Sequence, residues 1–302
     1  DSAKSSKLRR PPVLVGVFAL CAAQQTLRAQ DSPGKAAIRA ASGIINNPWT
    51  GNTLNDVTFA DLGLGPNVLK AVEEAGYTTP TPIQLESIPP ILAGGDVTGI
   101  AQTGTGKTAA FALPLLDQLL DARKPGPRAL VLAPTRELAT QIDAEIRLLA
   151  KFTPLKTVLV FGGASMRAQI AALRGRPEVV VACPGRLLDL LGQGAIRLCD
   201  VETLVLDEAD QLLDMGFRPD IDRIMSYLPA AADRQTLLFS ATMPPSLQQV
   251  IGTALRRDHV YLDTVGAAVV QTNAAVTQTS TVTTFQGPGP QLPDLLHPLA
   301  PG

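Results

Sequence analysis

The sequence predicts an α/β fold with a mostly parallel sheet covered by helices on both faces. Short apolar runs alternate with longer segments of helical periodicity from Asp56 to about Asp263, as in chains built from βαβ units. The runs are apolar throughout, which is typical of strands buried on both faces. Hydrophobic residues make up 45% of the 302 positions, enough for a buried core. We therefore expect one folded domain over residues 54–264, flanked by irregular N- and C-terminal segments.

Six runs are the predicted strands, and three segments between them are the clearest helices. The strands are Asp96–Ala101, Arg128–Ala133, Lys156–Phe161, Glu178–Ala182, Thr203–Asp207 and Gln235–Ser240. The helices, whose apolar positions recur at spacings of three and four, are Thr108–Leu120, Glu137–Leu149 and Pro244–Leu255. Because parallel strands all end at the same edge of a sheet, polar motifs that follow them are expected to gather there.

The two ends of the chain lack this alternation. Residues 1–53 are predicted to be an unstructured leader, and residues 265–302, rich in Ala, Val, Thr, Gln, Gly and Pro, a linker or disordered tail. Pro12–Ala23, which follows three basic residues, imitates a short signal peptide or part of a transit peptide. No run reaches the roughly 18 apolar residues of a membrane-spanning helix, so no membrane partner is expected.

Charge and cysteine content narrow the class of protein only a little. The formal net charge is -1, so nucleic-acid binding would require a local basic surface. Cys21, Cys183 and Cys199 are too far apart for a zinc site or a redox pair. Three such thiols favour a reducing compartment, and we expect the cytoplasm.

The segment Ala101–Thr108, "AQTGTGKT", joins a predicted strand to a predicted helix. Small residues let the main chain approach a phosphate, Lys107 can reach the outer phosphates, and the hydroxyl of Thr108 can hold Mg²⁺. The helix N-terminus adds free N–H groups and partial positive charge. A glycine-rich turn without a ligand is the alternative. The candidate nucleotide-binding residues here are Gln102, Thr103, Gly104, Thr105, Gly106, Lys107 and Thr108.

A second motif, Asp207-Glu208-Ala209-Asp210, ends the fifth predicted strand. Asp207 can hold Mg²⁺ through water, and Glu208 can orient and deprotonate an attacking water. An acidic helix N-terminus stabilised by the helix dipole is the alternative for this tetrapeptide in isolation. Together with the phosphate loop, the pair of carboxylates indicates nucleotide hydrolysis.

Seven segments occur in the order found in DEAD-box RNA helicases, which this chain resembles from Phe59 to about Asp263. They are Gly76–Gln84 "GYTTPTPIQ", Ala101–Thr108, Pro134–Ala139 "PTRELA", Gly162-Gly163, Cys183–Arg186 "CPGR", Asp207–Asp210 "DEAD" and Ser240–Thr242 "SAT". The resemblance implies a P-loop NTPase domain of RecA-like fold with a Q motif, the first of two such domains in that family. It implies an ATP hydrolase that uses ATP and Mg²⁺ to remodel RNA duplexes.

By this resemblance, Gln84 reads the adenine through its amide and Phe59 stacks on the base, with Tyr77 also at the ATP site. Phe59 is alternatively a core residue. The hydroxyls of Ser240 and Thr242 would link the state of the nucleotide to that of the RNA. The alternative for this tripeptide is an ordinary helix N-cap, and both interpretations can hold together.

The resemblance also assigns RNA-binding residues that hold backbone phosphates and sugars without reading bases. They are Pro134, Thr135, Arg136, Gly163, Pro184, Gly185 and Arg186. We expect single-stranded or duplex RNA as partner, without strong sequence preference. For either arginine, a surface or intradomain ion pair is the alternative. Cys183 stands where the family usually has Thr, which would weaken one phosphate contact by about 0.5–1.5 kcal/mol.

After Asp263 no further βαβ pattern and no arginine-rich run follows. In the family a second domain supplies an arginine finger, which can be worth about 10³–10⁵ in turnover. We therefore expect this chain to hold the first catalytic half of such a helicase, with slow hydrolysis on its own. A nucleotide-gated RNA-binding or decoy module is the alternative, and a small-molecule P-loop kinase would leave the "PTRELA" and "PTPIQ" segments without a role.

Overall fold

The structure, a computed structural model, describes residues 57–121, 124 and 126–265. The predicted leader over residues 1–53 lies outside the described residues, as does the predicted tail apart from Val265. The domain boundaries at residues 54 and 264 thus remain predictions.

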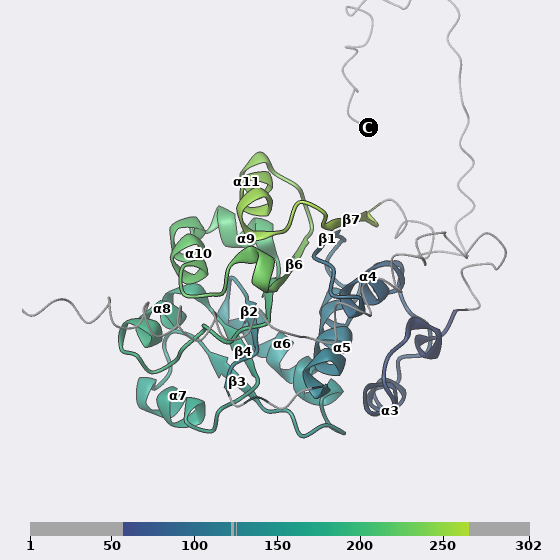
Figure 1. Cartoon of the computed structure of the whole chain (residues 1–302), viewed down its shortest axis with the longest axis horizontal. Coiled ribbons are helices and arrows are strands. Elements are labelled where there is room, and N and C mark those ends of the chain that lie inside the picture. The colour runs from purple at the N-terminus through teal and green to yellow at the C-terminus, as the bar shows by residue number, and fades with distance from the viewer. Residues whose placement is uncertain (1–56, 122–123, 125, 266–302) are drawn as a thin grey trace, which may run out of the picture. The chain divides into compact units, whose positions relative to one another are not determined.

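Seven parallel strands form one sheet in the part of the chain that the structure describes (Figure 1). Their order across the sheet is β3-β4-β2-β5-β6-β1-β7, and all neighbouring pairs are parallel. The register runs, for example, from Val97 opposite Leu237 to Ile100 opposite Ser240. The strands are β1 (Val97–Ile100), β2 (Ala129–Leu132), β3 (Thr157–Val160), β4 (Val179–Ala182), β5 (Thr203–Leu206), β6 (Gln235–Ser240) and β7 (Val260–Asp263).

Helices cover both faces of this sheet, and two hydrophobic clusters mark the faces. Successive strand residues alternate between the clusters, as a pleated strand requires: Val131 belongs to the first and Leu132 to the second. The first face is covered by η2 (Phe59–Leu62), α3 (Pro66–Glu74), α4 (Pro82–Leu92), α5 (Lys107–Leu120) and α6 (Arg136–Leu149). The second is covered by α7 (Met166–Leu173), α8 (Pro184–Gly192), α9 (Ala209–Asp214), α10 (Arg218–Met225) and α11 (Pro245–Ala254). A short turn of 3-10 helix, η3 (Ala231–Asp233), precedes β6.

The predicted fold class is confirmed, and the six predicted strands are present, five with slightly shorter bounds and β6 with the predicted bounds. β7 was not predicted as a strand. It lies at the edge of the sheet, and its residues alternate between half-buried and exposed positions instead of being apolar throughout. Hydrogen bonds from the backbone and guanidinium of Arg256 to the fully buried Asp96 hold this last segment against β1.

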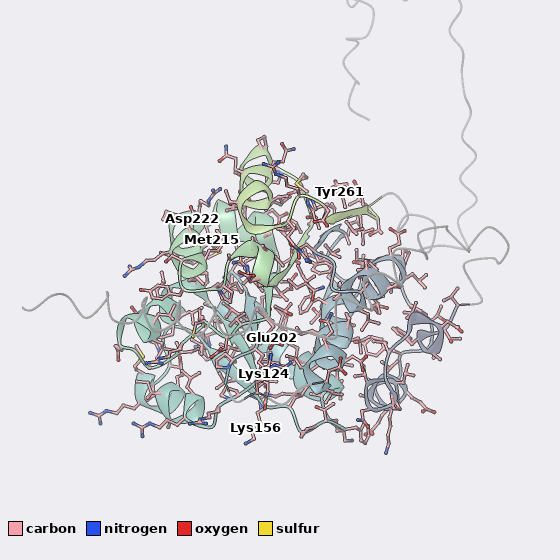
Figure 2. All side chains as sticks on the ribbon, in the orientation of Figure 1. Lys124, Lys156, Glu202, Met215, Asp222 and Tyr261 are labelled. Carbon is pink, nitrogen blue, oxygen red and sulfur yellow. The ribbon has the colours of Figure 1, made fainter. Side chains whose placement is uncertain are left out.

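No helix among the described residues is long and apolar enough to cross a membrane. Lys124 and Glu202, both labelled in Figure 2, form a partly exposed ion pair with 2.6 Å between Nζ and Oε1.

Candidate functional site

The loop between β1 and α5 folds over its own lysine. Lys107 begins α5 with a side chain that is only 5% exposed, and its Nζ donates a hydrogen bond of 3.1 Å to the carbonyl oxygen of Ala101. The same Nζ lies 2.9 Å from Oε1 of Glu208. Gly104 and Gly106 have φ angles of 80° and 84°, which favour glycine. The loop thus brings a buried ammonium next to a carboxylate that follows a different strand.

The outer side of this loop faces solvent. Gln102, Thr103 and Gly104 are exposed, and Thr105 is half-buried with its hydroxyl donating to the carbonyl oxygen of Gln102 over 2.7 Å. Thr108, one residue into α5, is also half-buried.

Asp207 and Glu208 lie at the end of β5, both buried. Oδ1 of Asp207 accepts a hydrogen bond of 3.0 Å from the backbone amide of Glu208. Burial, and then the charge of Glu208, raise the pKa of Asp207 to about 7, although Lys107 opposes the shift. Glu208 has a φ of 45°, a conformation that strains a residue other than glycine and often occurs at functional sites. Its Oε2 is buried without a hydrogen bond among the described residues, so it remains available as an acceptor.

Asp210 connects this motif to the end of β6. Its Oδ2 accepts hydrogen bonds from the hydroxyl of Thr242 at 2.7 Å and from the amide of Thr242 at 2.9 Å. Its own amide donates to Oγ of Ser240 at 3.2 Å. Burial by itself would raise the pKa of Asp210, but the hydrogen bonds from Thr242 and Ser240 outweigh it and lower the pKa. The N-cap alternative for this segment is wrong, because α11 is capped by Pro244.

Gln84 ties α4 to the loop between β1 and α5. It is 1% exposed, and its Oε1 accepts from the amide of Thr81, the N-cap of α4, at 2.9 Å. Its Nε2 donates to the carbonyl oxygen of Gly106 at 3.1 Å. A Cβ atom at Gly106 would lie 2.4 Å from that Nε2, so the contact requires glycine there. Recognition of adenine by Gln84 stays a prediction; beyond these two bonds the amide keeps a second lone pair on Oε1 and a second N–H on Nε2.

Phe59 is buried in the core, and Tyr77 is half-buried and packs against that core. Phe59 is 4% exposed and meets the Tyr77 ring edge-on, with 6.1 Å between ring centroids. The structure therefore makes Phe59 a core residue, and its stacking on a base stays a prediction. The Tyr77 hydroxyl donates to Oε1 of Glu145 at 3.0 Å, and Glu145 also takes a hydrogen bond from the side chain of Thr108. Burial raises the pKa of Glu145, against the effect of these two hydrogen bonds.

The strand order divides the carboxyl-terminal edge of the sheet into two halves. The phosphate loop, the Asp207–Asp210 motif and the Ser240–Thr242 motif follow β1, β5 and β6, which are neighbours. The loops that begin at Ala133, Phe161 and Cys183 follow β2, β3 and β4, also neighbours. Two candidate sites therefore lie side by side along one edge.

A sequence model of the DEAD/DEAH box helicase family matches residues 81–250, which is more than half of the chain. The chain belongs to this family. The DEAD-box ATP-dependent RNA helicase RhpA of Helicobacter pylori is 50% identical over 200 residues, covering 66% of this chain and 40% of the relative. The ATP-dependent RNA helicase CshA of Limosilactobacillus reuteri is 47% identical over 192 residues, covering 64% and 38%.

A solved structure gives the same result. The crystal structure of a DEAD box protein from the hyperthermophile Methanococcus jannaschii superimposes with a TM-score of 0.66 at 37% identity. The match covers 71% of this chain and 58% of that one. The chain spans about two fifths of the length of the curated helicases RhpA and CshA.

On the β2, β3 and β4 half of the edge of this DEAD/DEAH box domain, Arg136 is an exposed cation. It is exposed, and its guanidinium carbon lies 4.8 Å from the centroid of the Phe161 ring, which holds the side chain over the neighbouring loop. Thr135 caps α6 by accepting from the amide of Leu138 at 3.2 Å, while Pro134 is buried. Arg136 is therefore well placed to meet a phosphate.

Arg186 is placed differently from Arg136. Its side chain is 13% exposed, and Nη1 donates to the carbonyl oxygen of Ala164 at 3.0 Å, beside the loop that contains Gly163. Gly163 is exposed with a φ of 78°. The contact with Ala164 favours a role for Arg186 in holding this loop, with the exposed backbone of Gly163 and Gly185 left to meet a ligand.

Two residues that lie in or beside the candidate site were given no role from the sequence. Asp210 was visible as the last member of the Asp207–Asp210 motif but was given no role. Glu145 lies in the middle of α6, with no motif to mark it, and only the packing of α6 beside α5 brings it to Thr108 and Tyr77.

Proposed function

We propose that this chain is the ATP-binding half of a DEAD-box ATP-dependent RNA helicase. It binds ATP with Mg²⁺ on the β1, β5 and β6 half of the edge, and single-stranded or duplex RNA on the β2, β3 and β4 half, without strong sequence preference. In the longer protein, hydrolysis of ATP is coupled to remodelling of the RNA duplex. The observation that carries this proposal is the buried cluster of Lys107, Asp207 and Glu208.

The residues on the β1, β5 and β6 half of the sheet edge suit the binding of a chain of phosphates. The loop around Gly104 is open to solvent on its outer side, and Oε2 of Glu208 is a buried acceptor without a partner among the described residues. When Mg²⁺ is bound, it would neutralise negative charge that develops on the transferring phosphoryl group. Thr108 and Asp207 are the residues that would hold it. The described residues contain no group of three or more His, Cys, Asp or Glu side chains that could hold a metal, which suits an ion that takes further oxygens from phosphate and water.

The contacts of Lys107 indicate how its own charge is used. Its ammonium is held by Glu208 and by the carbonyl oxygen of Ala101, two oxygens that phosphate oxygens would replace. That exchange would free the carboxylate of Glu208 to orient a water and accept its proton. Because Asp210 accepts a hydrogen bond from Thr242, a shift of the Asp207–Asp210 segment on nucleotide binding would also move the end of β6.

We also place the protein in the cytoplasm, where ATP and RNA occur together. A reducing compartment suits Cys183, which is a free thiol.

Equilibrium binding of a fluorescent ATP analogue, with and without Mg²⁺, tests the proposal first. ATP hydrolysis is then measured with and without single-stranded RNA, and Glu208→Gln serves as the blank. We expect Mg²⁺-dependent binding and slow turnover by this chain, which spans about two fifths of the length of the curated helicases RhpA and CshA. Failure of the wild-type chain to bind ATP would refute the proposal. Binding of ATP and RNA with turnover at the blank would favour a nucleotide-gated RNA-binding module instead.

A further inference from the structure

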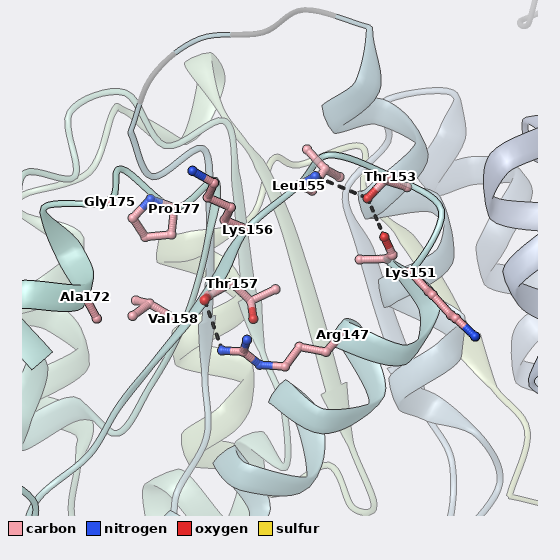
Figure 3. A pocket seen from close by; sticks show the side chains of 11 residues that line it. Arg147, Lys151, Thr153, Leu155, Lys156, Thr157, Val158, Ala172, Gly175 and Pro177 are labelled. Carbon is pink, nitrogen blue, oxygen red and sulfur yellow. Dashed lines mark hydrogen bonds between the residues drawn. The ribbon is translucent and has the colours of Figure 1, made fainter.

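A cavity of about 500 Å³ lies at the opposite end of the strands from the motif loops. It is formed by the end of α6, the segment leading into β3, and the turn after α7 (Figure 3). Lys156 and Glu178 immediately precede β3 and β4, whereas the candidate RNA loops follow these two strands. Three cations, Arg147, Lys151 and Lys156, line the cavity, and no carboxylate is among its lining residues.

Arg147 is held in place while much of it faces solvent. Its Nε lies 2.7 Å from Oδ2 of Asp143, and its Nη2 donates to the carbonyl oxygen of Thr157 at 3.0 Å (Figure 3). The side chain is nevertheless 54% exposed, and Nη1 makes no hydrogen bond among the described residues. A guanidinium fixed on one side and open on the other is suited to bind phosphate oxygens.

The rim of the cavity carries further cations, although Glu178 also lies beside it, with its Oε2 accepting a hydrogen bond of 2.8 Å from the backbone amide of Lys156. Lys151 is paired with Glu74 of α3, so its charge is partly balanced. Lys156 projects into solvent at the edge of the domain, and no carboxylate partner for its ammonium occurs among the described residues (Figure 2). Arg174 and Arg176 flank the lining residue Gly175 in sequence and are likewise exposed without an ion pair in the described part of the chain.

We propose that this cavity and its rim bind backbone phosphates of a second stretch of the RNA, so that one RNA contacts both ends of β3 and β4. The proposal rests on the proposed RNA binding by the motif loops. The cations are exposed and spread along a rim, which suits an extended polyanion. A small phosphate ligand would be expected to meet buried, convergent polar groups instead.

A protein partner fits the same surface less well. Protein interfaces are usually anchored by buried aromatic side chains, and none of the lining residues is aromatic. The exposed large hydrophobic residues of the described chain, Leu148, Met215 and Tyr261, do not line the cavity. The chain as a whole has a net charge of -1, so this cationic rim is a local feature.

The test compares RNA of two lengths at several salt concentrations. A single strand of about 6 nucleotides lies within the range of about 4–16 nucleotides typical of one single-strand binding site, whereas about 30 nucleotides exceed it. The rim variant is Lys156→Gln with Arg174→Gln. The matched control removes two exposed charges elsewhere, with Arg223→Gln on α10 and Arg257→Gln after α11. Arg136→Gln reports on the motif loops.

Each phosphate contact contributes about 0.7 to the slope of log K against log salt for single-stranded nucleic acid. We expect the rim variant to lower that slope by about 1.4 for the long RNA and to leave the short RNA unchanged. Arg136→Gln should weaken both, and the control variant neither. Because the proposed phosphate contact would cover the ammonium of Lys156, long RNA should lower the extent of Lys156 acetylation in the wild-type chain by at least about threefold. Mass spectrometry measures this extent.

Three outcomes would overturn the assignment. The first is that the rim and control variants have the same slopes with long RNA. The second is that tripolyphosphate or ATP protects Lys156 as well as long RNA does, which would make the cavity a site for free phosphates. The third is that the wild-type chain binds RNA of neither length. That result would refute the proposed function as well, whereas the first two leave it standing.

Discussion

Replacing Glu208 by Gln should move two equilibrium measurements of this chain in opposite directions. In the structure, Oε1 of Glu208 lies 2.9 Å from the ammonium of Lys107, and both side chains are less than a tenth exposed. Removing one partner of a buried ion pair costs about 3–5 kcal/mol. Gln can still accept one hydrogen bond from Lys107, which also keeps the carbonyl oxygen of Ala101. We therefore expect a smaller loss in the free energy of unfolding, about 1–3 kcal/mol.

Thermal unfolding without nucleotide measures this loss. For a folded part of this size, 1 kcal/mol corresponds to about 2–4 °C in Tm, so Glu208→Gln should lower Tm by roughly 2–12 °C. ATP affinity should rise, because the phosphates no longer displace a carboxylate from Lys107. Glu73→Gln, an exposed change on α3, is the matched control and should alter neither quantity. An unchanged Tm, or weaker ATP binding by Glu208→Gln, would refute the argument that this ion pair stabilises the nucleotide-free domain and competes with the phosphates for Lys107.

Three further predictions concern groups around the site. Tyr77→Phe removes the hydrogen bond to Glu145 and should destabilise the domain by about 1–2 kcal/mol in denaturant unfolding. Burial, followed by the charge of Glu145, raises the pKa of Tyr77 to about 12, so the wild type should lose this Tyr77-dependent stability as the pH rises from about 10 to 12, whereas the variant should not. Parallel pH profiles of the two proteins would contradict this prediction. Arg256→Ala leaves the carboxylate of Asp96 buried with backbone donors alone and should lower the unfolding free energy by about 2–4 kcal/mol, whereas a loss below about 0.5 kcal/mol would show that the pair is dispensable. Burial, with a smaller effect of nearby charge, raises the pKa of Cys183 to about 11, so its alkylation at pH 8 should be at least tenfold slower in the folded than in the unfolded chain, and equal rates would exclude the shift.

The strands of the central sheet could be predicted because their residue types alone identify them as strands buried on both faces. A run such as Val179–Ala182 is buried on both faces, so every side chain must be apolar and the signal is local. β7 gave no such signal, since it lies at the sheet edge with Tyr261 exposed. In α4, Pro89 and Pro90 argue against a helix locally, yet the helix continues to Leu92 because its apolar side packs in the core.

The sequence predicts which residues form the candidate site, and their roles stay predictions, but it does not predict the contacts between them. The spacing of Lys107 and Thr108 after a strand indicates phosphate binding without any knowledge of neighbours. Nothing in that spacing shows that Lys107 pairs with Glu208, or that Gln84 bonds to Gly106 from another helix. These contacts join residues 22 or more positions apart in the chain, and therefore depend on which strands become neighbours.

The sequence by itself determined the fold class and the family motifs, because buried strands and phosphate loops require particular residues at particular spacings. The tertiary structure decided how those motifs are grouped: it placed the candidate nucleotide-binding motifs on one half of the sheet edge and the candidate RNA-binding motifs on the other. It also decided that Arg136 is open while Arg186 is largely buried, and that cations gather at the far end of β3 and β4. The physical reason is that strand order and side-chain burial arise from long-range packing, which no local pattern of residues specifies.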